Sequence, residues 1–240
     1  MTKDKLFSNG KISEDFTFND KVADVFDDMV NRSVPFYTTV IKGIGDLLNR
    51  HLCDGNTVVD LGCSTGSTLL ELSRQLTAQN IRYIGVDNAA PMIEKARRKS
   101  ELFSKDHLIE FREEDITQYD VDGANAVICN YTLQFIRPVA RQSFLQGIYD
   151  GLAPGGLLLL SEKTISQEGQ LNRNFIDIYH QFKKDQGYSE LEIATKREAL
   201  ENVLVPFSPQ ENLEMLGRAG FSSMDIFFKW FNFSSFIAIK

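Results

Sequence analysis

The stretch VVDLGCSTGS, residues 58–67, decides the fold that this sequence predicts. A short apolar run ends at Asp60, and Gly62 and Gly66 then follow in a G-x-x-x-G spacing. A strand that runs directly into a glycine-rich turn and then into a helix is typical of the first unit of a parallel α/β sheet. Ligands of such sheets bind at the carboxyl ends of the strands, where glycine permits a close approach of the backbone. The stretch therefore predicts a binding site as well as the first strand.

Strand and helix patterns alternate on both sides of this stretch. We expect strands at 56–61, 81–86, 108–112, 124–129 and 157–161, and helices at 67–77, 90–104 and 138–151. Short apolar strands separated by helices indicate a parallel sheet that is covered on both faces. The aromatic tail SSMDIFFKWFNFSSFIAIK, residues 222–240, predicts two closing strands in a hairpin. The sequence thus predicts an α/β fold.

Two helical additions flank this core. Residues 19–51 predict two amino-terminal helices, the second starting at Pro35, and residues 162–207 predict a helical insertion. Within the insertion, 170–203 reads as two helices broken around Gly187, and a further helix near 208–219 ends at Gly220. No stretch has the composition of a linker, so residues 1–240 are predicted to form a single domain.

Composition and charge restrict the function. The chain has 240 residues, 42% of them hydrophobic, and a net charge of −7, which favours a small-molecule substrate over a nucleic acid. We see no apolar run long enough for a membrane helix and no signal peptide, so no membrane association is expected. The three cysteines and three histidines are scattered, which is typical of reduced thiols in a cytoplasmic protein and predicts no metal site.

The strand-end loop also resembles a known motif. Asp60 and the glycines that follow it are similar to the first motif of S-adenosylmethionine-dependent methyltransferases, D/E-x-G-x-G-x-G, with Ser64 in place of the middle glycine. The spacing differs from the G-x-G-x-x-G of dinucleotide sites. A tight strand-to-helix turn in another α/β protein is the alternative.

Polar residues at three further strand ends fit the same ligand. Asp87 follows the second strand, where a carboxylate can accept hydrogen bonds from both ribose hydroxyls. Asp115 follows the third, where it can accept from the adenine amino group while Ile116 packs on the ring. Asn130 ends the fourth strand and can hold the methionine part. Each residue alone can also cap a helix or form a turn.

A narrower resemblance covers residues 4–240. It rests on eight segments: VADVFDDMVNRSVPFY, DLGCSTG, VDNAAPM, CNYTLQF, LSEK, IYHQFKKDQGYSELEI, KREALENVL and FNFSSFIAIK. Together they resemble the carboxy-S-adenosyl-L-methionine synthases, which act in tRNA wobble-uridine modification. In that family serine is expected at the position of Ser64.

The resemblance implies a fold and a reaction. The fold is the Rossmann-like class I methyltransferase fold, a mainly parallel seven-stranded sheet with an antiparallel C-terminal strand. The reaction converts S-adenosyl-L-methionine and prephenate into carboxy-S-adenosyl-L-methionine and phenylpyruvate, through a sulfonium ylide that captures CO2. The resemblance also implies a homodimer with residues 162–207 at the dimer contact, helices of residues 19–51 that cover the site, and a product that passes to a tRNA-modifying enzyme. The acidic charge opposes direct binding of nucleic acid, and the reduced thiols indicate a cytoplasmic protein.

The resemblance also implies which residues contact the ligand. They are Tyr37, Gly62, Cys63, Ser64, Asp87, Asn88, Asp115, Ile116, Asn130 and Arg197. Tyr37 and Arg197 are the predicted catalytic residues; Arg197 is expected to meet the new carboxylate of the product from the other subunit. The alternative for Arg197 is a surface pair with Glu201 at i,i+4 spacing. Arg32 is a second candidate cation for prephenate, and it can instead cap helix carbonyls.

Three other functions stay open on the sequence. The first is an ordinary methyltransferase that modifies a small molecule. The second is a tRNA methyltransferase, which the acidic charge disfavours. The third is a module without catalysis that presents the nucleoside to a partner enzyme. The product that forms with prephenate distinguishes these functions from the synthase.

Overall fold

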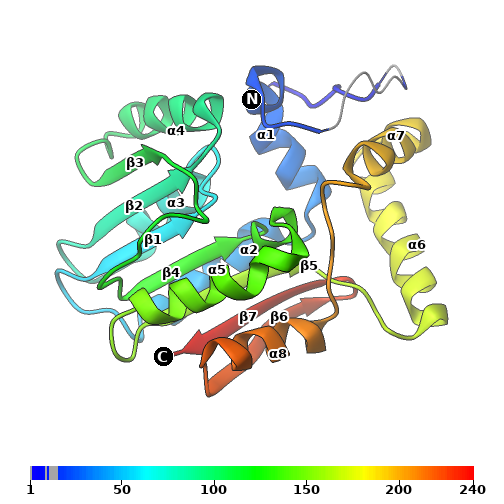
Figure 1. Ribbon diagram of the computed structural model, residues 1–240. Coiled ribbons are helices and arrows are strands. Elements are labelled where there is room, and N and C mark those ends of the chain that lie inside the picture. Colours follow the sequence, from blue (N-terminus) through cyan, green and yellow to red (C-terminus); the bar gives the residue numbers. More distant parts are fainter. Residues whose placement is uncertain (1, 9, 11–15) are drawn as a thin grey trace.

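The computed structural model describes residues 2–8, 10 and 16–240, and its core is one seven-stranded sheet (Figure 1). The strands follow the order β3-β2-β1-β4-β5-β7-β6. Their bounds are β1 (Thr57–Leu61), β2 (Arg82–Asp87), β3 (Ile109–Glu113), β4 (Ala126–Asn130), β5 (Leu157–Lys163), β6 (Ser223–Trp230) and β7 (Phe233–Ile239). The first five strands run parallel, and β7 is antiparallel to both of its neighbours. The predicted fold class is confirmed, including the closing hairpin.

Helices cover both faces of the sheet because alternate strand residues point to opposite sides. On one face Val59 packs with residues of α5 (Pro138–Gly151) and α8 (Pro209–Ala219). On the other face Val58 packs with residues of α2 (Tyr37–Leu48), α3 (Ser67–Gln75) and α4 (Ala90–Leu102). The sheet order reverses between β1 and β4, so the loop after β1 lies at the switch point, where ligands bind in such folds.

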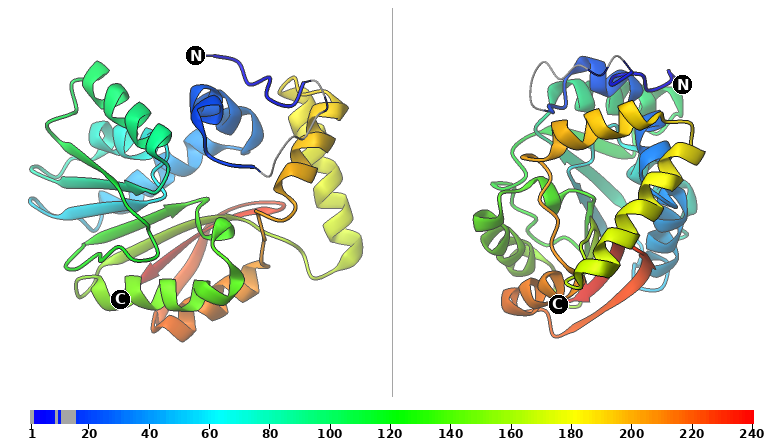
Figure 2. Two further views of the ribbon diagram at one scale, coloured as in Figure 1. Left: turned by 45° about the horizontal axis from the view of Figure 1, so that its top comes forward. Right: turned by 90° about the vertical axis from the view of Figure 1, so that its right-hand side faces the viewer.

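Three helices lie beyond the carboxyl ends of the parallel strands (Figure 1). They are α1 (Asp20–Ser33), α6 (Gly169–Asp185) and α7 (Glu190–Leu200). Figure 2 shows α6 and α7 past the end of the sheet, on the side where α1 lies. Gly187, at φ +85°, separates α6 from α7, which confirms the predicted break. A capping box between Ser189 and Glu192 then starts α7.

The amino-terminal helix bounds differ slightly from the prediction. The second helix was expected from Pro35, but α2 begins at Tyr37. Phe36 adopts a left-handed conformation at φ 57°. The second helix therefore cannot include Phe36 and begins at Tyr37. This turn places Tyr37 at the start of α2, directly beside the carboxyl ends of the strands. None of the helices in the described residues is both long and apolar enough to cross a membrane.

Candidate active site

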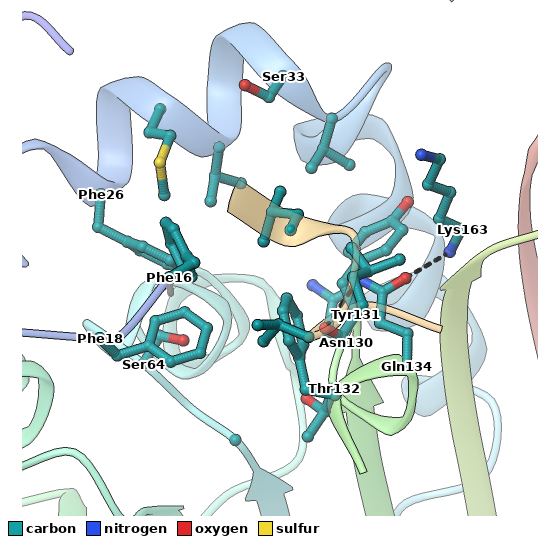
Figure 3. Close-up of a pocket in the computed structure, with 18 of the residues that line it drawn as sticks. Phe16, Phe18, Phe26, Ser33, Ser64, Asn130, Tyr131, Thr132, Gln134 and Lys163 are labelled. Atoms are coloured by element: carbon teal, nitrogen blue, oxygen red, sulfur yellow. Dashed lines mark hydrogen bonds between the residues drawn. The ribbon is translucent and has the colours of Figure 1, made fainter. Parts of the chain in front are cut away.

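A cavity of about 1160 Å³ lies at the carboxyl ends of the parallel strands. The loops after the strands form one wall, and α1, α6 and α7 supply the others. All of the predicted ligand residues line this one cavity: Tyr37, Gly62, Cys63, Ser64, Asp87, Asn88, Asp115, Ile116, Asn130 and Arg197. In the view of Figure 3, Asn130 lies between Ser64 and Lys163. The structure therefore brings together residues that the sequence spreads over 160 positions.

The loop after β1 has a conformation that explains its glycine pattern. Gly62 has φ +79°, and a Cβ atom there would meet the Thr132 side chain at 2.5 Å. Gly62 N and Cys63 N donate to Val86 O, at 2.8 and 3.0 Å. Ser64 has φ 49°, in the left-handed region where glycine is at ease. A glycine in the middle of the motif is thus favoured by the backbone, and Ser64 takes that conformation at some cost.

Asp87 holds this loop from the end of β2. Its Oδ2 accepts a hydrogen bond from Ser64 N at 2.9 Å, and its Oδ1 accepts one from Ala89 N at 3.0 Å. Burial raises the pKa of the Asp87 carboxyl, and the backbone donors oppose that rise. Each carboxylate oxygen has a second lone pair. Asp87 can therefore fix the loop and still accept hydrogen bonds from a diol.

Asp115 forms a turn and also lines the cavity, so its binding role stays a prediction. Its Oδ1 accepts hydrogen bonds from Thr117 N at 2.9 Å and from Thr117 Oγ1 at 2.8 Å, which makes an Asx turn. The same residue lines the cavity beside Ile116. The turn therefore aims the second carboxylate oxygen rather than excluding a binding role.

Two acceptors beneath the loop have no partner in the described part of the chain. Asn130 Nδ2 donates to Thr68 Oγ1 at 3.3 Å, but the buried Asn130 Oδ1 accepts no hydrogen bond. Both carboxylate oxygens of Asp60 are likewise buried and unpaired. Burial, together with the nearby Asp87 charge, raises the pKa of Asp60 to about 8. Of the two residues only Asn130 lines the cavity, and unpaired buried acceptors are rare in folded proteins, so this end of the cavity suits a ligand that brings a donor to Asn130 Oδ1.

Tyr37 and Tyr131 stand on the same side of the cavity, with ring centroids 6.2 Å apart. Burial raises the pKa of the Tyr37 hydroxyl well above its usual value. Tyr37 therefore stays protonated near neutral pH and can donate a hydrogen bond, but it is a poor base. Tyr131 has φ 65°, a second left-handed residue of the cavity wall.

A partly buried ion pair fastens α1 to the loop. Lys99 Nζ lies 3.0 Å from both carboxylate oxygens of Asp27. The Asp27 Oδ1 atom also accepts hydrogen bonds from Thr65 Oγ1 at 2.6 Å and Ser67 Oγ at 2.9 Å. Burial alone would raise the pKa of Asp27, but Lys99 and the hydroxyl donors hold it below its usual value. Thr65, which had no predicted role, thus ties the loop to the helix that covers it.

Aromatic side chains line the cavity on the side where Ser64 lies (Figure 3). The Phe18 ring lies 5.2 Å from that of Phe16 and 5.4 Å from that of Phe135, measured between centroids. Together with Phe26 these residues line the cavity (Figure 3). They keep that end of the cavity apolar. These phenylalanines were not predicted as site residues, because isolated phenylalanines form no motif whose spacing would indicate a binding site.

The opposite end of the cavity is cationic. Five basic side chains line it: Lys163, His180, Lys183, Lys196 and Arg197. Burial, and then repulsion by the neighbouring cations, lowers the pKa of Lys183 to about 7. Burial lowers the pKa of Lys196 to about 8, although Asp4 lies 3.8 Å away and opposes the change. Lys163 and Lys183 were not predicted as site residues, although both lie in segments on which the family resemblance rests. Lys163 ends LSEK, and Lys183 begins KKDQG.

Arg197 faces the cavity rather than a surface acid. Within residues 2–8, 10 and 16–240 it forms no ion pair, so the alternative pair with Glu201 is absent from these residues. In the single chain Arg197 already lines the cavity from its own α7. The arrangement in which it enters from a second subunit stays a prediction.

Arg32, the second candidate cation, has a different role from the one expected. Among the described residues it is not part of the cavity wall. Its Nε donates to Gln186 O at 2.9 Å, and its guanidinium lies 4.0 Å from the centroid of the Tyr188 ring. Its Nη1 lies 3.2 Å from Asp28 Oδ2. Arg32 therefore fastens α1 to the α6–α7 turn, and its predicted contact with the substrate is wrong for this structure.

Known proteins share both the sequence and the fold. Residues 58–156 match a family model described as a methyltransferase domain. The carboxy-S-adenosyl-L-methionine synthase of Desulfotalea psychrophila is 60% identical, over 99% of this chain and 97% of the relative. The synthase of Nautilia profundicola is 47% identical, over 99% of this chain and 100% of the relative.

Solved structures agree at the level of the fold. A putative S-adenosyl-L-methionine-dependent methyltransferase of Methanococcus maripaludis superposes with a TM-score of 0.63 at 18% identity, over 96% of this chain and 97% of the other. Human N-acetylserotonin methyltransferase, crystallised with S-adenosylmethionine, superposes with a TM-score of 0.63 at 16% identity, over 92% of this chain and 55% of the other. At these identities the likeness concerns the class I methyltransferase fold alone.

Proposed function

This chain belongs to the carboxy-S-adenosyl-L-methionine synthase family, and we propose that it converts S-adenosyl-L-methionine and prephenate into carboxy-S-adenosyl-L-methionine and phenylpyruvate. It is a transferase with a methyltransferase fold that uses S-adenosylmethionine. The choice of prephenate, the mechanism and the later use of the product in tRNA wobble-uridine modification form the proposal.

One observation carries the proposal: a single cavity joins a nucleoside-type loop to a cluster of cations that lack acid partners. Lys163, Lys183 and Arg197 line the cavity, and no acid lies within ion-pair distance of them in the described residues. Methyl transfer to a neutral molecule does not require such a cluster. A second substrate with two carboxylates does, because a buried anion must be paired.

The reaction balances without a further reagent. Prephenate loses its ring carboxyl group as CO2 and its ring hydroxyl as hydroxide, and becomes phenylpyruvate. The hydroxide removes a proton from the sulfonium methyl group and leaves as water. The ylide that remains bonds to CO2, which gives the new carboxylate. Because water would protonate the ylide, the site must exclude bulk solvent; the aromatic cover of Phe16, Phe18 and Phe26 supports such exclusion.

Five of the predicted residues have a task in this scheme. Asp87 accepts from the ribose hydroxyls, and Asp115 accepts from the adenine amino group. The unpaired Asn130 Oδ1 accepts from the methionine amino group. Tyr37 donates a hydrogen bond and does not act as the base, because its pKa is raised. Arg197 holds the new carboxylate with its planar fork of donors, a contact that lysine cannot reproduce.

The remaining expectations concern assembly. We propose that residues 162–207 contribute to a homodimer and that a tRNA-modifying enzyme consumes the product. Four large apolar side chains of this region are exposed in the single chain: Ile165 at 36%, Leu171 at 46%, Ile178 at 37% and Leu191 at 54%. An exposed apolar surface of this kind supports a protein contact.

The test follows the products of the purified protein. Incubation with S-adenosylmethionine and prephenate should release phenylpyruvate, and mass spectrometry should detect the carboxylated nucleoside. Arg197→Ala should lower carboxylated product at least tenfold, since a charged hydrogen-bond pair contributes about 1.5–3 kcal/mol. Arg173→Ala, on the exposed side of α6, is the control. Unmodified S-adenosylmethionine after incubation with prephenate would instead support an ordinary methyltransferase.

A further inference from the structure

A row of aromatic rings crosses the cavity from the nucleoside loop to the cationic end. The centroids of Tyr37 and Tyr131 are 6.2 Å apart, those of Tyr131 and Phe233 are 6.1 Å apart, and those of Phe233 and Tyr179 are 5.0 Å apart. All four residues line the cavity. This aromatic wall offers an apolar surface, longer than a single ring, between the two polar ends.

The ammonium groups of two lysines lie near Tyr179, the ring at the far end of this wall. Lys163 Nζ lies 5.3 Å from the Tyr179 centroid, and Lys183 Nζ lies 4.5 Å from it. Both nitrogens therefore lie beside one ring, and the charge of Lys163 is near enough to lower the pKa of Lys183. The Tyr179 hydroxyl donates to Ser33 O at 2.9 Å, which fixes the ring against α1. Gln134 Oε1 accepts from Lys163 N at 3.0 Å and fixes the end of β5 (Figure 3).

Neither ammonium group has an acceptor within the described residues. No hydrogen bond or ion pair forms at Lys163 Nζ or Lys183 Nζ there, although Lys183 is only 5% exposed. The neighbouring lysines are satisfied: Lys184 pairs with Glu190, and Lys196 Nζ donates to Ser33 Oγ at 2.9 Å. Lys183 is the more deeply buried of the two, and a largely buried ammonium group without a protein acceptor is unfavourable. An anion that enters the cavity would remove that penalty.

The two carboxylates of the proposed second substrate need separate places. The ring carboxyl group leaves as CO2 and must be released beside the sulfonium, where Arg197 holds the new carboxylate. The 2-oxo carboxylate of the side chain is kept in the product phenylpyruvate. It therefore needs an anchor that does not take part in the bond changes, one short side chain away from the ring carbon that loses CO2.

We propose that Lys163 and Lys183 hold the retained 2-oxo carboxylate of the second substrate, and that the aromatic wall receives its six-membered ring. The inference rests on the proposed function and adds a binding subsite to it. Because the same carboxylate is present before and after the reaction, the two lysines bind substrate and keto-acid product alike. They contribute to affinity and not to the chemical step.

The experiment measures binding without turnover. S-Adenosylhomocysteine lacks the reactive methyl group, so calorimetry with it in place gives the dissociation constants of prephenate and phenylpyruvate directly. Lys163→Gln and Lys183→Gln should each weaken both acids at least tenfold and leave the affinity for S-adenosylmethionine within twofold. In turnover assays the same variants should raise KM for prephenate with kcat nearly unchanged.

Lys184→Gln is the matched control, because Lys184 follows Lys183 on the same helix and pairs with Glu190 outside the cavity. It should leave both dissociation constants unchanged. Glutamine removes an unpaired buried charge, so the two test variants should fold and melt at or above the wild-type temperature.

The outcomes separate the two proposals. If the Lys163→Gln and Lys183→Gln proteins bind phenylpyruvate as tightly as the wild type, the subsite is wrong even if the synthase reaction occurs. Failure of the wild type to bind either acid would also overturn it. If the wild type binds both acids through these lysines but forms no carboxylated product, the subsite stands and the proposed reaction fails.

Discussion

The two ends of the cavity are built in opposite ways. At the loop end the polar groups are held by the backbone: Asp87 accepts from Ser64 N and Ala89 N, and Gly62 N donates to Val86 O. At the cationic end, Lys163 and Lys183 extend from β5 and α6 and find no acceptor in the described residues. The difference indicates that the loop end is formed before a ligand arrives. The cationic end becomes fully paired only when an anion binds.

Substitution of Gly62 should break the loop end with the largest effect. Gly62→Ala puts a Cβ atom 2.5 Å from Thr132 Cγ2, in a backbone conformation at φ +79° that disfavours alanine. We expect a loss of about 2–4 kcal/mol in the free energy of unfolding, since overpacking and left-handed strain add. Affinity for S-adenosylmethionine should fall roughly 100-fold, about 2.8 kcal/mol. Denaturant titration and calorimetry measure the two changes.

Gly155→Ala is the control for backbone strain. Gly155 has φ +74°, but its added Cβ atom would meet nothing within 4 Å. It should lose only about 1 kcal/mol of stability, which is the cost of the left-handed conformation alone. Equal losses at Gly62 and Gly155 would show that the contact with Thr132 does not matter.

Ligand binding at the cationic end should depend on pH. Nothing at the loop end predicts such a dependence. Burial and the cations around it lower the pKa of Lys183 to about 7 in the chain without a ligand. The charged groups that face it are Lys163 on β5, Lys196 and Arg197 on α7, and His180 on α6. Below pH 7 the ammonium is present and binds a carboxylate. As pH rises above 7, binding requires proton uptake, so the affinity for phenylpyruvate should fall by up to about tenfold per pH unit.

The same shift predicts the sign of the stability change. The folded pKa of Lys183 lies below the unfolded value of 10.5, so the unfolded chain holds more protons between about pH 7 and 10.5. This group therefore makes the ligand-free protein more stable as pH rises through that window. Lys183→Arg keeps its charge and should flatten the pH dependence of phenylpyruvate binding. A wild-type affinity that stays constant from pH 6 to 9 contradicts the assignment.

The contrast between the two ends also explains what the sequence could predict. The loop end follows from local patterns, because Gly62, Asp87, Asp115 and Asn130 each end or follow a strand, and parallel strands end at the same edge. The fold followed for the same reason, since strand and helix periods are local. The bounds shifted by one or two residues where a conformation such as that of Phe36 depends on tertiary contacts.

The cationic end had no such local signal. Lys163 and Lys183 meet only because α6 crosses the cavity beyond β5, and both then lie over Tyr179. Arg197 was predicted from the family resemblance and not from its surroundings, which are rich in acids. Arg32 shows the converse error: an arginine near the site bonds to Gln186 O because the packing of α1 against α6 places a carbonyl there.

Substitution of Ser64 at the loop end should have a smaller effect on stability than substitution of Gly62. Ser64 sits at φ 49°, where a non-glycine residue costs about 1–2 kcal/mol, while glycine costs about 0.5–1 kcal/mol in lost chain freedom. The difference between these terms is about 0–1.5 kcal/mol, so Ser64→Gly should raise the free energy of unfolding by that amount at most. Its N–H still donates to Asp87. Ser73→Gly in α3, where φ suits any residue, should instead lose about 0.5 kcal/mol.

The binding result for Ser64→Gly then decides why serine stands at a position that favours glycine. The Ser64 hydroxyl has no hydrogen-bond partner within the described residues, and it lines the cavity. If it donates to the bound nucleoside, its loss should weaken S-adenosylmethionine about three- to tenfold, as one neutral hydrogen bond would. If affinity is unchanged while stability rises, Ser64 contributes nothing to the ligand. The loop end would then depend on its backbone alone, which is the sharpest form of its contrast with the side chains of the cationic end.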